Sequence, residues 1–359
     1  MRIAIDVRPL TSTMTGIGRY TYNILSRLLE NSPEHEWFLY AHRPLTVNLP
    51  SKPNIHIRTG NIWLNQANAV YAQIVFPIWA YNDKIDVFWS PRHHLPVLLP
   101  SKIKKIVTIQ DIVWYRYPET MTRLGWLQEY MLMPLSIKIS DHVLTISDFT
   151  KSELVSALNI APDKITVTPL APVDLPKNVM PELPAELVGK KFFLFVGTIE
   201  PRKNLGNLLE AYAKFCKNNN DVNLVIAGKD GWGNQSISSI VQTLQIKNRV
   251  TILGYVDDCM LHALYQNCLA LLMPSLYEGF GLPAVEALNY TKPVMAGLKS
   301  GISSTMSSLV VNNTDDSAEA ILEGLIKIEE KMNFDFSRPE LETWNDVAKV
   351  TKRILLSIT

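Results

Sequence analysis

The sequence predicts an α/β protein of two domains, each built on a parallel β-sheet with helices on both faces. Three observations indicate this fold class. The chain has 359 residues, about twice one ordinary domain, and short β-branched runs alternate with helical patterns along most of its length. A proline-rich stretch interrupts this alternation near the middle. Two Rossmann-like β/α/β domains facing a central cleft would bind ligands at the carboxyl ends of their strands.

The N-terminal domain is expected at residues 1–172. Its candidate strands are short apolar runs at Arg2–Asp6, Trp37–His42, Asn54–Arg58, Asp86–Ser90, Lys105–Ile109, His142–Ile146 and Ile165–Pro169. Amphipathic patterns at Gly18–Glu30 and Leu124–Ile139 predict helices between these strands. Strands that alternate with helices favour parallel pairing.

A linker and a second alternating series follow. Ala171–Lys191 carries four prolines without a periodic pattern, and we expect a linker at 173–190. The C-terminal domain is expected at 191–338, with candidate strands at Phe192–Val196, Asn223–Ala227, Val250–Leu253, Ala270–Met273 and Pro293–Ala296. Residues 339–359 form a last helical pattern outside that sheet.

Charge and cysteine content narrow the function classes. The chain has 35 basic and 34 acidic residues, and this balance argues against a general nucleic-acid binder. Its three cysteines lack metal-type spacing and read as reduced thiols, which favours the cytoplasm. The chain opens with a predicted strand and has no apolar run of membrane-spanning length, so we expect neither a signal peptide nor a spanning helix.

The most informative segment is Ser275–Val294. A buried-strand pattern leads into a loop with Gly279-Phe280-Gly281, and Pro283 then marks the first turn of a helix. Glycines let the backbone approach a ligand closely, and the unpaired N–H groups of a helix start attract phosphate. Glu278 and Glu286, eight positions apart, flank this turn and can accept hydrogen bonds from two ends of one ligand.

Two cations follow the first strand of the second domain. Arg202 and Lys203 stand just before a predicted helix, where they can neutralise a diphosphate leaving group without a metal ion. In the first domain, Gly16-Ile17-Gly18 opens a helix after a strand, and a close approach to phosphate is sensible there. It matches the dinucleotide fingerprint only in part, because the third glycine is missing.

At these residues the chain resembles the family-four glycosyltransferases, which are retaining enzymes with the two-domain GT-B fold. It is most similar to the bacterial mannosyltransferase-like group that builds O-antigens and other surface polysaccharides. The motifs that carry the resemblance run end to end: TGIGRYTYNIL, TIQDIVWYRYPE, LTISDFTKSEL, GTIEPRKN, LVIAGKDGW, VTILGYVDD and PSLYEGFGLPAVEA. The resemblance implies transfer of a hexose, best matched by mannose from GDP-mannose, although UDP- and dTDP-sugars use similar loops.

The resemblance also implies roles for individual residues. Glu278 contacts the sugar hydroxyls, Glu286 contacts the ribose, and Arg202 with Lys203 holds the diphosphate. Gly16 and Gly18 approach the diphosphate from the first domain, and the C-terminal helix at 339–359 is expected to cross back onto that domain. The remaining donor contacts are expected to be backbone groups or neighbours of the base, at Thr198, Tyr255, Phe280, Gly281 and Leu282.

The sequence departs from the family pattern near the reacting carbon. The group usually has His-Asp where this chain has Gln110 and Asp111, and glutamine cannot become cationic. His93 or His94 is an alternative source of that charge, or each is structural or contacts the acceptor. Asp111 is an acceptor-side candidate or a strand-end cap. An arginine common in relatives is Thr198 here, which leaves more of the phosphate charge to Arg202.

No D-x-D sequence occurs, so we expect a metal-independent transferase whose only small-molecule partners are the nucleotide sugar and the acceptor. The acceptor in related enzymes is often a lipid-linked saccharide. The three lysines within Ser101–Val107 either make peripheral contact with the inner membrane or belong to an ordinary exposed loop that leads into a buried strand. The alternative function is a catalytically silent sugar-nucleotide-binding partner in a glycan assembly complex. A sugar-nucleotide epimerase is a third hypothesis, which the Glu278–Glu286 loop disfavours.

Overall fold

The computed structural model of the chain describes all residues except 61–67, 174–181, 219–220, 234–235, 332–338 and 359. The chain divides into two compact units. Unit 1 contains Met1–Trp114, Arg123–Leu170 and Glu342–Thr359, and unit 2 contains Tyr115–Thr122 and Ala171–Leu341. Tyr115–Thr122 therefore groups with unit 2, although the sequence placed it inside the N-terminal domain. Positions 174–181 of the expected linker lie outside the described residues.

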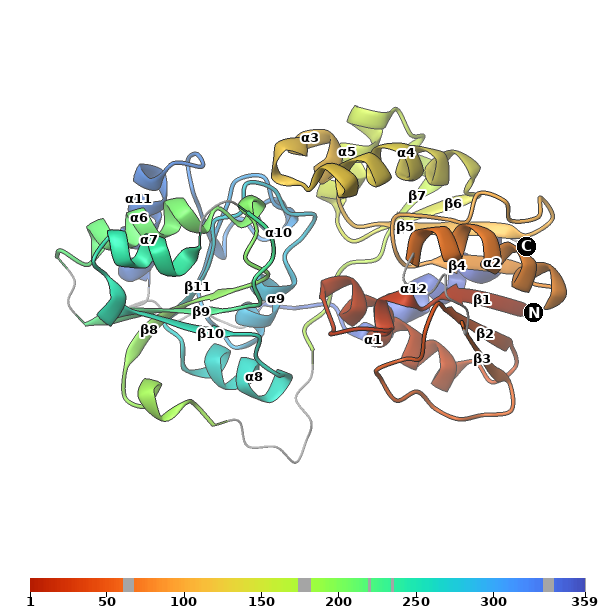
Figure 1. Cartoon of the computed structure of the whole chain (residues 1–359), viewed down its shortest axis with the longest axis horizontal. Coiled ribbons are helices and arrows are strands. Elements are labelled where there is room, and N and C mark those ends of the chain that lie inside the picture. The colour runs from red at the N-terminus through yellow and green to blue at the C-terminus, as the bar shows by residue number, and fades with distance from the viewer. Residues whose placement is uncertain (61–67, 174–181, 219–220, 234–235, 332–338, 359) are drawn as a thin grey trace. The chain divides into compact units, whose positions relative to one another are not determined.

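Unit 1 is built on a seven-stranded parallel sheet in the order β3-β2-β1-β4-β5-β6-β7 (Figure 1). Its strands are β1 (Arg2–Asp6), β2 (Glu36–Ala41), β3 (Ile55–Thr59), β4 (Val87–Ser90), β5 (Lys104–Ile109), β6 (His142–Thr145) and β7 (Ile165–Val167). All seven were expected from the sequence, with ends that differ by at most two residues. Strands buried on both faces read as continuous apolar runs, which is why they are recognisable.

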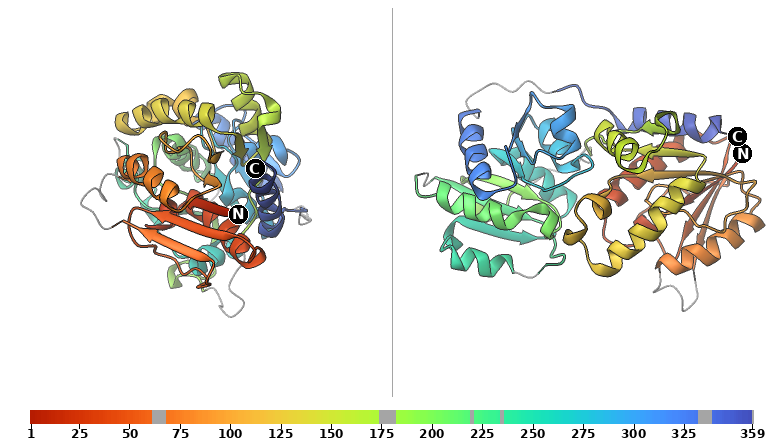
Figure 2. Two further views of the ribbon diagram at one scale, coloured as in Figure 1. Left: turned by 90° about the vertical axis from the view of Figure 1, so that its right-hand side faces the viewer. Right: turned by 90° about the horizontal axis from the view of Figure 1, so that it is seen from above.

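The helices of unit 1 are α1 (Gly16–Asn31), α2 (Asn68–Asn82), α3 (Val113–Arg116, at the border of the two units), α4 (Arg123–Ile139), α5 (Asp148–Leu158) and α12 (Trp344–Ser357). The C-terminal helix α12 packs against α1, as the blue and red helices of Figure 1 and the views of Figure 2 show. The buried Trp344 ring lies 6.3 Å from the Tyr20 ring. Lys352 Nζ lies 3.0 Å from Glu34 Oε1 beside it.

Unit 2 has a six-stranded parallel sheet in the order β10-β9-β8-β11-β12-β13. Its strands are β8 (Lys191–Val196), β9 (Val222–Ala227), β10 (Val250–Gly254), β11 (Ala270–Met273), β12 (Val294–Ala296) and β13 (Val310–Asn312). Its helices are α6 (Leu205–Phe215), α7 (Ile237–Thr243), α8 (Asp258–Asn267), α9 (Leu282–Asn289), α10 (Gly301–Thr305) and α11 (Ala318–Lys331). The sequence missed β13, whose three residues are too short to show a pattern.

Helices α6, α7 and α11 cover one face of this sheet with a single apolar core, and α8 and α9 lie on the opposite side (Figure 1). Phe193 and Leu272 belong to that core on the sheet side, and Leu208 and Leu325 belong to it on the helix side. Parallel strands place all their carboxyl ends at one edge. The loops that follow β8 and β11, which are paired strands, therefore lie side by side at that edge.

Among the helices that the structure describes, none combines the length and the apolar character that crossing a bilayer requires.

Candidate active site

The carboxyl edge of the unit 2 sheet brings Glu278 together with Arg202 and Lys203. Glu278 follows β11, and the two cations lie in the short turn Pro201–Lys203 between β8 and α6. Arg202 Nη1 lies 2.9 Å from Glu278 Oε2, and Lys203 Nζ forms an ion pair with Glu278 Oε1. The sequence proposed these three residues, separated by about seventy-five positions, as parts of one site, and the fold places them in direct contact.

Two further residues complete this cluster. Arg202 Nη2 donates a 2.7 Å hydrogen bond to Glu200 Oε1, and Ser275 Oγ donates one of 3.0 Å to Glu278 Oε1. Sequence analysis did not single out Glu200 or Ser275. The one available signal was their position, two or three residues from the residues that it did name.

Glu278 is ionised although only 8% of its surface is exposed. Burial by itself raises the pKa of the carboxyl, but the charges of Arg202 and Lys203 and their hydrogen bonds outweigh burial and lower the pKa to about 2. The carboxylate therefore carries its charge at every physiological pH. An ionised carboxylate accepts hydrogen bonds and cannot donate them.

The turn after Glu278 is held by backbone hydrogen bonds to the loop that follows β12. Glu278 N donates to Lys299 O at 3.0 Å, and Ile302 N donates to Phe280 O at 3.0 Å. Gly281 has a φ of 114°, and a Cβ there would lie 2.7 Å from Met273 Cε, so only glycine fits. Helix α9 begins at the next residue, Leu282.

The N–H groups of Phe280, Gly281 and Leu282 have no acceptor among the residues that the structure describes. They stand at the start of α9, where the helix dipole adds partial positive charge. This geometry suits an anionic ligand group.

Glu286 lies in α9, buried, with Oε2 accepting a 2.7 Å hydrogen bond from the Tyr265 hydroxyl of α8. The ion pairs of the Glu278 cluster do not include Glu286. Tyr265 is a partner that sequence reasoning missed, because a buried tyrosine on a helix looks like an ordinary core residue. It orients the carboxylate that the resemblance assigns to the ribose.

Glycines create the room around Lys203. Gly197, at the end of β8, has a φ of 153°, and a Cβ there would lie 3.5 Å from Lys203 Cε. Gly228 passes so close to Gly197 that a Cβ on it would overlap the Gly197 carbonyl oxygen at 1.8 Å. The half-buried Thr198 follows Gly197, and the half-exposed Tyr255 follows β10 at the same edge of the sheet.

In unit 1, Gly16 and Gly18 open α1, as expected from the sequence. Gly18 is buried, and a Cβ there would lie 3.1 Å from Pro9 O and from Met14 Cγ. This close contact with the preceding loop gives Gly18 a packing role of its own. Gly16 is exposed, and nothing lies within 4 Å of the position its Cβ would take.

The acceptor-side candidates gather at the carboxyl edge of the unit 1 sheet, around a residue that the sequence did not suggest. Glu129 Oε2 on α4 lies 3.2 Å from His93 Nδ1 and 3.0 Å from His94 Nε2. Burial opposes charge on both rings. The Glu129 carboxylate overcomes this at His93, whose pKa is raised, but not at His94, whose pKa is lowered. His93 is thus the cationic candidate of the pair.

Gln110 and Asp111 follow β5 at this edge. Gln110 is buried, with Nε2 3.4 Å from Pro91 O, and Asp111 Oδ1 accepts a 3.3 Å hydrogen bond from Val113 N. Asp111 therefore makes the contact of a strand-end cap, which is one of the two roles expected for it from the sequence. Its carboxylate is partly exposed, so this contact leaves the acceptor-side interpretation open.

The lysine-rich segment does not form the basic surface that the sequence suggested. Lys105 is buried and donates from Nζ to Pro100 O at 3.1 Å and to Ile103 O at 2.8 Å. Lys104 Nζ lies 3.4 Å from Asp141 Oδ1, and Lys102 Nζ lies over the Tyr81 ring. The prediction of three surface lysines was wrong, because the side chain of Lys105 turns back to cap its own loop.

Comparisons with known proteins agree with this arrangement. The model described as "Glycosyltransferase Family 4" matches residues 14–171, and "Glycosyl transferases group 1" matches residues 182–338. The chain is 29% identical over 320 residues to O-antigen chain mannosyltransferase B of Escherichia coli, a match that covers 82% of each protein.

Solved structures share the fold over the whole chain. Sucrose-phosphate synthase from Thermosynechococcus elongatus superposes with a TM-score of 0.73 at 16% identity, over 99% of this chain and 98% of that one. The HepE protein of Anabaena in complex with UDP-glucose does so with a TM-score of 0.64 at 14% identity, over 99% of this chain and 100% of that one. Since family models match both halves and the fold is shared throughout, the chain belongs to the family-four glycosyltransferases with the GT-B fold.

Proposed function

We propose that this glycosyltransferase moves mannose from GDP-mannose, with retention of configuration, to a saccharide acceptor in surface-glycan synthesis. The observation that carries the proposal is the buried, ionised Glu278 held between Arg202 and Lys203 at the start of α9. The similarity to an O-antigen mannosyltransferase over four-fifths of both chains supports the sugar and the pathway class.

The cations have a defined task in this reaction. Negative charge grows on the diphosphate as its bond to the anomeric carbon breaks, and preorganised positive groups stabilise that charge. Arg202 and Lys203 are already held in place by Glu200 and Glu278, so little reorganisation is needed when the diphosphate binds. The N–H groups from Phe280 to Leu282 supply further donors.

The two glutamates act at opposite ends of the donor. Glu278 remains ionised and accepts hydrogen bonds from hydroxyls of the transferred sugar. Glu286, oriented by the Tyr265 hydroxyl, accepts hydrogen bonds from the ribose. This division separates nucleotide affinity from the chemical step, and it makes the two residues distinguishable by substitution.

Retention follows from attack on the face that the diphosphate leaves. The acceptor oxygen bonds to the anomeric carbon, the bond from that carbon to the phosphate oxygen breaks, and the acceptor proton passes to the leaving phosphate. This route needs no protein base. Gln110, which cannot become charged, is compatible with it, and His93, whose pKa the Glu129 carboxylate raises against burial, is the candidate for a cationic ring on the acceptor side.

A panel of donors tests the proposal. Purified enzyme is given GDP-mannose, UDP-glucose or a dTDP-sugar with a saccharide acceptor, and transfer and donor hydrolysis are both measured. Faster turnover of GDP-mannose supports the proposal, while a preference for UDP-sugars, as the UDP-glucose complex of HepE would suggest, replaces the base and sugar but keeps the reaction. Binding without turnover of any donor would favour the silent partner.

The acceptor is proposed to be lipid-linked, reached by peripheral contact with a membrane surface. Apolar side chains stand exposed at helical spacing on α2, at Ile74, Ile78 and Tyr81, and on α4, at Leu127 and Met131. Helix α2 has no charged residue in its fifteen, so its outer face is as apolar as its inner one. Exposed apolar patches of this kind mark sites of contact with a membrane or with another protein, and we assign this one to a membrane.

A further inference from the structure

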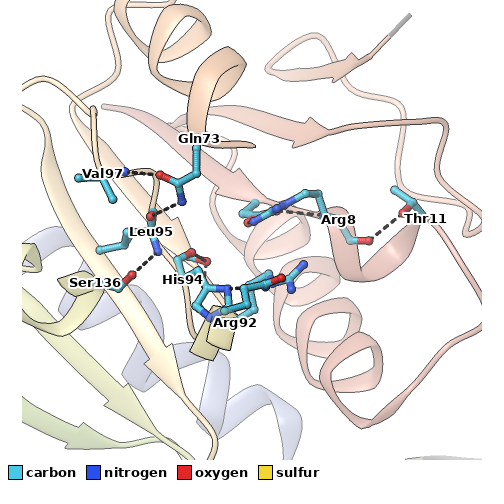
Figure 3. Close-up of polar contacts among 11 residues, drawn as sticks. Arg8, Thr11, Gln73, Arg92, His94, Leu95, Val97 and Ser136 are labelled. Carbon is cyan, nitrogen blue, oxygen red and sulfur yellow. Dashed lines mark hydrogen bonds and ion pairs between the residues drawn. The ribbon is translucent and has the colours of Figure 1, made fainter. Parts of the chain in front are cut away.

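Unit 1 contains a group of buried charges of its own. Strands β2, β1 and β4 are neighbours in the sheet, and the residues just after their carboxyl ends include His42, Arg8 and Arg92. Asp6 closes β1 beside them. Figure 3 shows Arg8 and Arg92 with the contacts that hold their backbones.

Hydrogen bonds from neighbouring side chains fix the backbone at both arginines. Ser90 Oγ donates to Arg92 O at 3.0 Å and to His94 O at 2.8 Å, which shapes the loop after β4. Gln73 of α2 and Ser136 of α4 then hold Leu95 through hydrogen bonds of 3.0 and 2.9 Å (Figure 3). A side chain on such a loop is presented in a defined direction, as binding sites require.

The carboxylates of this region are already engaged. Arg8 Nε and Nη2 both donate to Asp6, with Nε 2.9 Å from Oδ1 and Nη2 2.5 Å from Oδ2. Glu129 accepts from His93 and His94. The guanidinium of Arg92 forms no hydrogen bond or ion pair with any residue in the described part of the chain.

His42 adds an unsatisfied donor. It is 1% exposed, and its Nε2 accepts a 2.8 Å hydrogen bond from Arg43 Nε. Burial, followed by the charges of Arg43 and Arg8, lowers the pKa of the ring to about 4, so the ring is neutral and its single proton resides on Nδ1. Among the described residues Nδ1 has no hydrogen-bond partner, although it is buried.

Electrostatics shows that these groups share one neighbourhood. Burial and then the charge of Arg8 lower the pKa of Arg92 to about 10, and Asp6 and Glu129 only partly compensate. Arg8 and Arg92 likewise both act on His42. Asp6 is thus paired with Arg8, and Glu129 with the two histidines, whereas the Arg92 guanidinium and the His42 Nδ1–H have no acceptor among the described residues. An added oxyanion would satisfy these donors and remove the repulsion between the cations.

We propose that Arg92, supported by the nearby buried Arg8 and His42, binds an oxyanion of the acceptor, a phosphate or a carboxylate, at the carboxyl edge of the unit 1 sheet. Arg92 is partly exposed, so a ligand can reach it, and its planar fork suits both groups. This proposal rests on the proposed function only where it names the acceptor as the molecule that carries the oxyanion. Binding of the oxyanion itself is independent of any transfer activity.

The direct test follows the Arg92 side chain by NMR in the full-length protein, titrated with methyl phosphate and, separately, with acetate. The Arg92 Nε signal, identified by its loss in Arg92→Gln, should shift with at least one probe. The stronger probe tells whether the acceptor group is a phosphate or a carboxylate. A signal that neither probe moves overturns the proposal, and this result does not depend on how well the variant folds.

Affinity gives the second readout. Arg92→Gln should weaken binding of the effective probe at least tenfold, which corresponds to ~1.4 kcal/mol. Arg92→Lys keeps the charge but loses the planar guanidinium fork, so its affinity for the probe should lie between those of the wild type and Arg92→Gln. Arg353→Gln, a change of an exposed arginine on α12, should bind like the wild type. Equal affinity in Arg92→Gln and Arg353→Gln would refute the site.

Transfer assays separate this proposal from the proposed function. Arg92→Gln should raise the KM for an anionic acceptor and leave the rate of donor hydrolysis unchanged, because Arg202 and Lys203 are intact. If the wild type hydrolyses no nucleotide sugar, the proposed function fails while oxyanion binding can still stand. If hydrolysis is normal and Arg92→Gln leaves the acceptor KM unchanged, the assignment to the acceptor fails.

Discussion

Replacing Lys203 by alanine tests the Glu278 cluster most directly, because it removes one of the two cations that keep this carboxylate ionised. At Glu278 the pKa falls from an ordinary 4.5 to about 2, against the effect of burial. At about 1.4 kcal/mol per pKa unit, this net shift contributes ~3 kcal/mol to stability at neutral pH, after the cost of burial. Arg202 remains in the variant, so we expect Lys203→Ala to lose part of this stabilisation, on the order of 1–2 kcal/mol.

The pH dependence follows from the sign of this shift. The folded-state pKa is depressed, so the stabilisation is fully present above the unfolded value of 4.5 and disappears as the pH falls toward 2. In Lys203→Ala the pKa of Glu278 should move upward. The difference in unfolding free energy between wild type and variant should therefore be largest near pH 7 and shrink below pH 4.

Urea unfolding at pH 7 and pH 3 measures this difference, and a transfer assay measures the catalytic consequence. Loss of a preorganised cation at the leaving group should slow transfer by about a hundredfold or more. Lys214→Ala is the matched control, since Lys214 pairs with Glu319 on the exposed side of unit 2 and should change neither quantity by much. Unchanged turnover in Lys203→Ala would remove this residue from the mechanism.

Three other predictions concern the donor, the metal and the membrane. Glu286→Gln should weaken binding of the nucleoside diphosphate about tenfold, whereas Glu278→Gln should spare that binding and impair transfer. Calorimetry measures the binding, and an equal loss of affinity in both variants would disprove the assignment. Transfer should persist in excess chelator, and an absolute need for Mg²⁺ or Mn²⁺ would contradict a diphosphate site made of side chains and backbone. Flotation with anionic vesicles should recover the wild type and much less of an Ile78→Ser, Met131→Ser variant; equal recovery would place membrane contact elsewhere.

Local sequence patterns were sufficient to predict most strands of the two sheets and the loops that carry the charged residues. The β1 and β11 runs, Arg2–Asp6 and Ala270–Met273, have the expected bounds, because the inner positions of a strand buried on both faces form a continuous apolar run. The Glu278 loop and the Arg202-Lys203 turn were also recognisable, since each combines glycine or proline with charged residues at a strand end. The three-residue β13 lacked such a signal, and helix α11 was missed although its buried Ile321, Leu325 and Ile328 recur at helical spacing.

Contacts between distant residues were decided only by the tertiary structure. Glu129 joins His93 and His94 from a helix about 35 positions away, and Tyr265 holds Glu286 from a neighbouring helix. The sequence could not reveal that Lys105 caps its own loop, because a lysine in a strand pattern normally reaches solvent. Periodicity determines which residues are apolar and where the backbone turns, so sequence alone established two parallel α/β domains with a charged loop after β11. Packing of the folded chain determines which polar groups are removed from water and must find partners. Only the tertiary structure therefore shows which charged side chains gather around Glu278 and around Arg92.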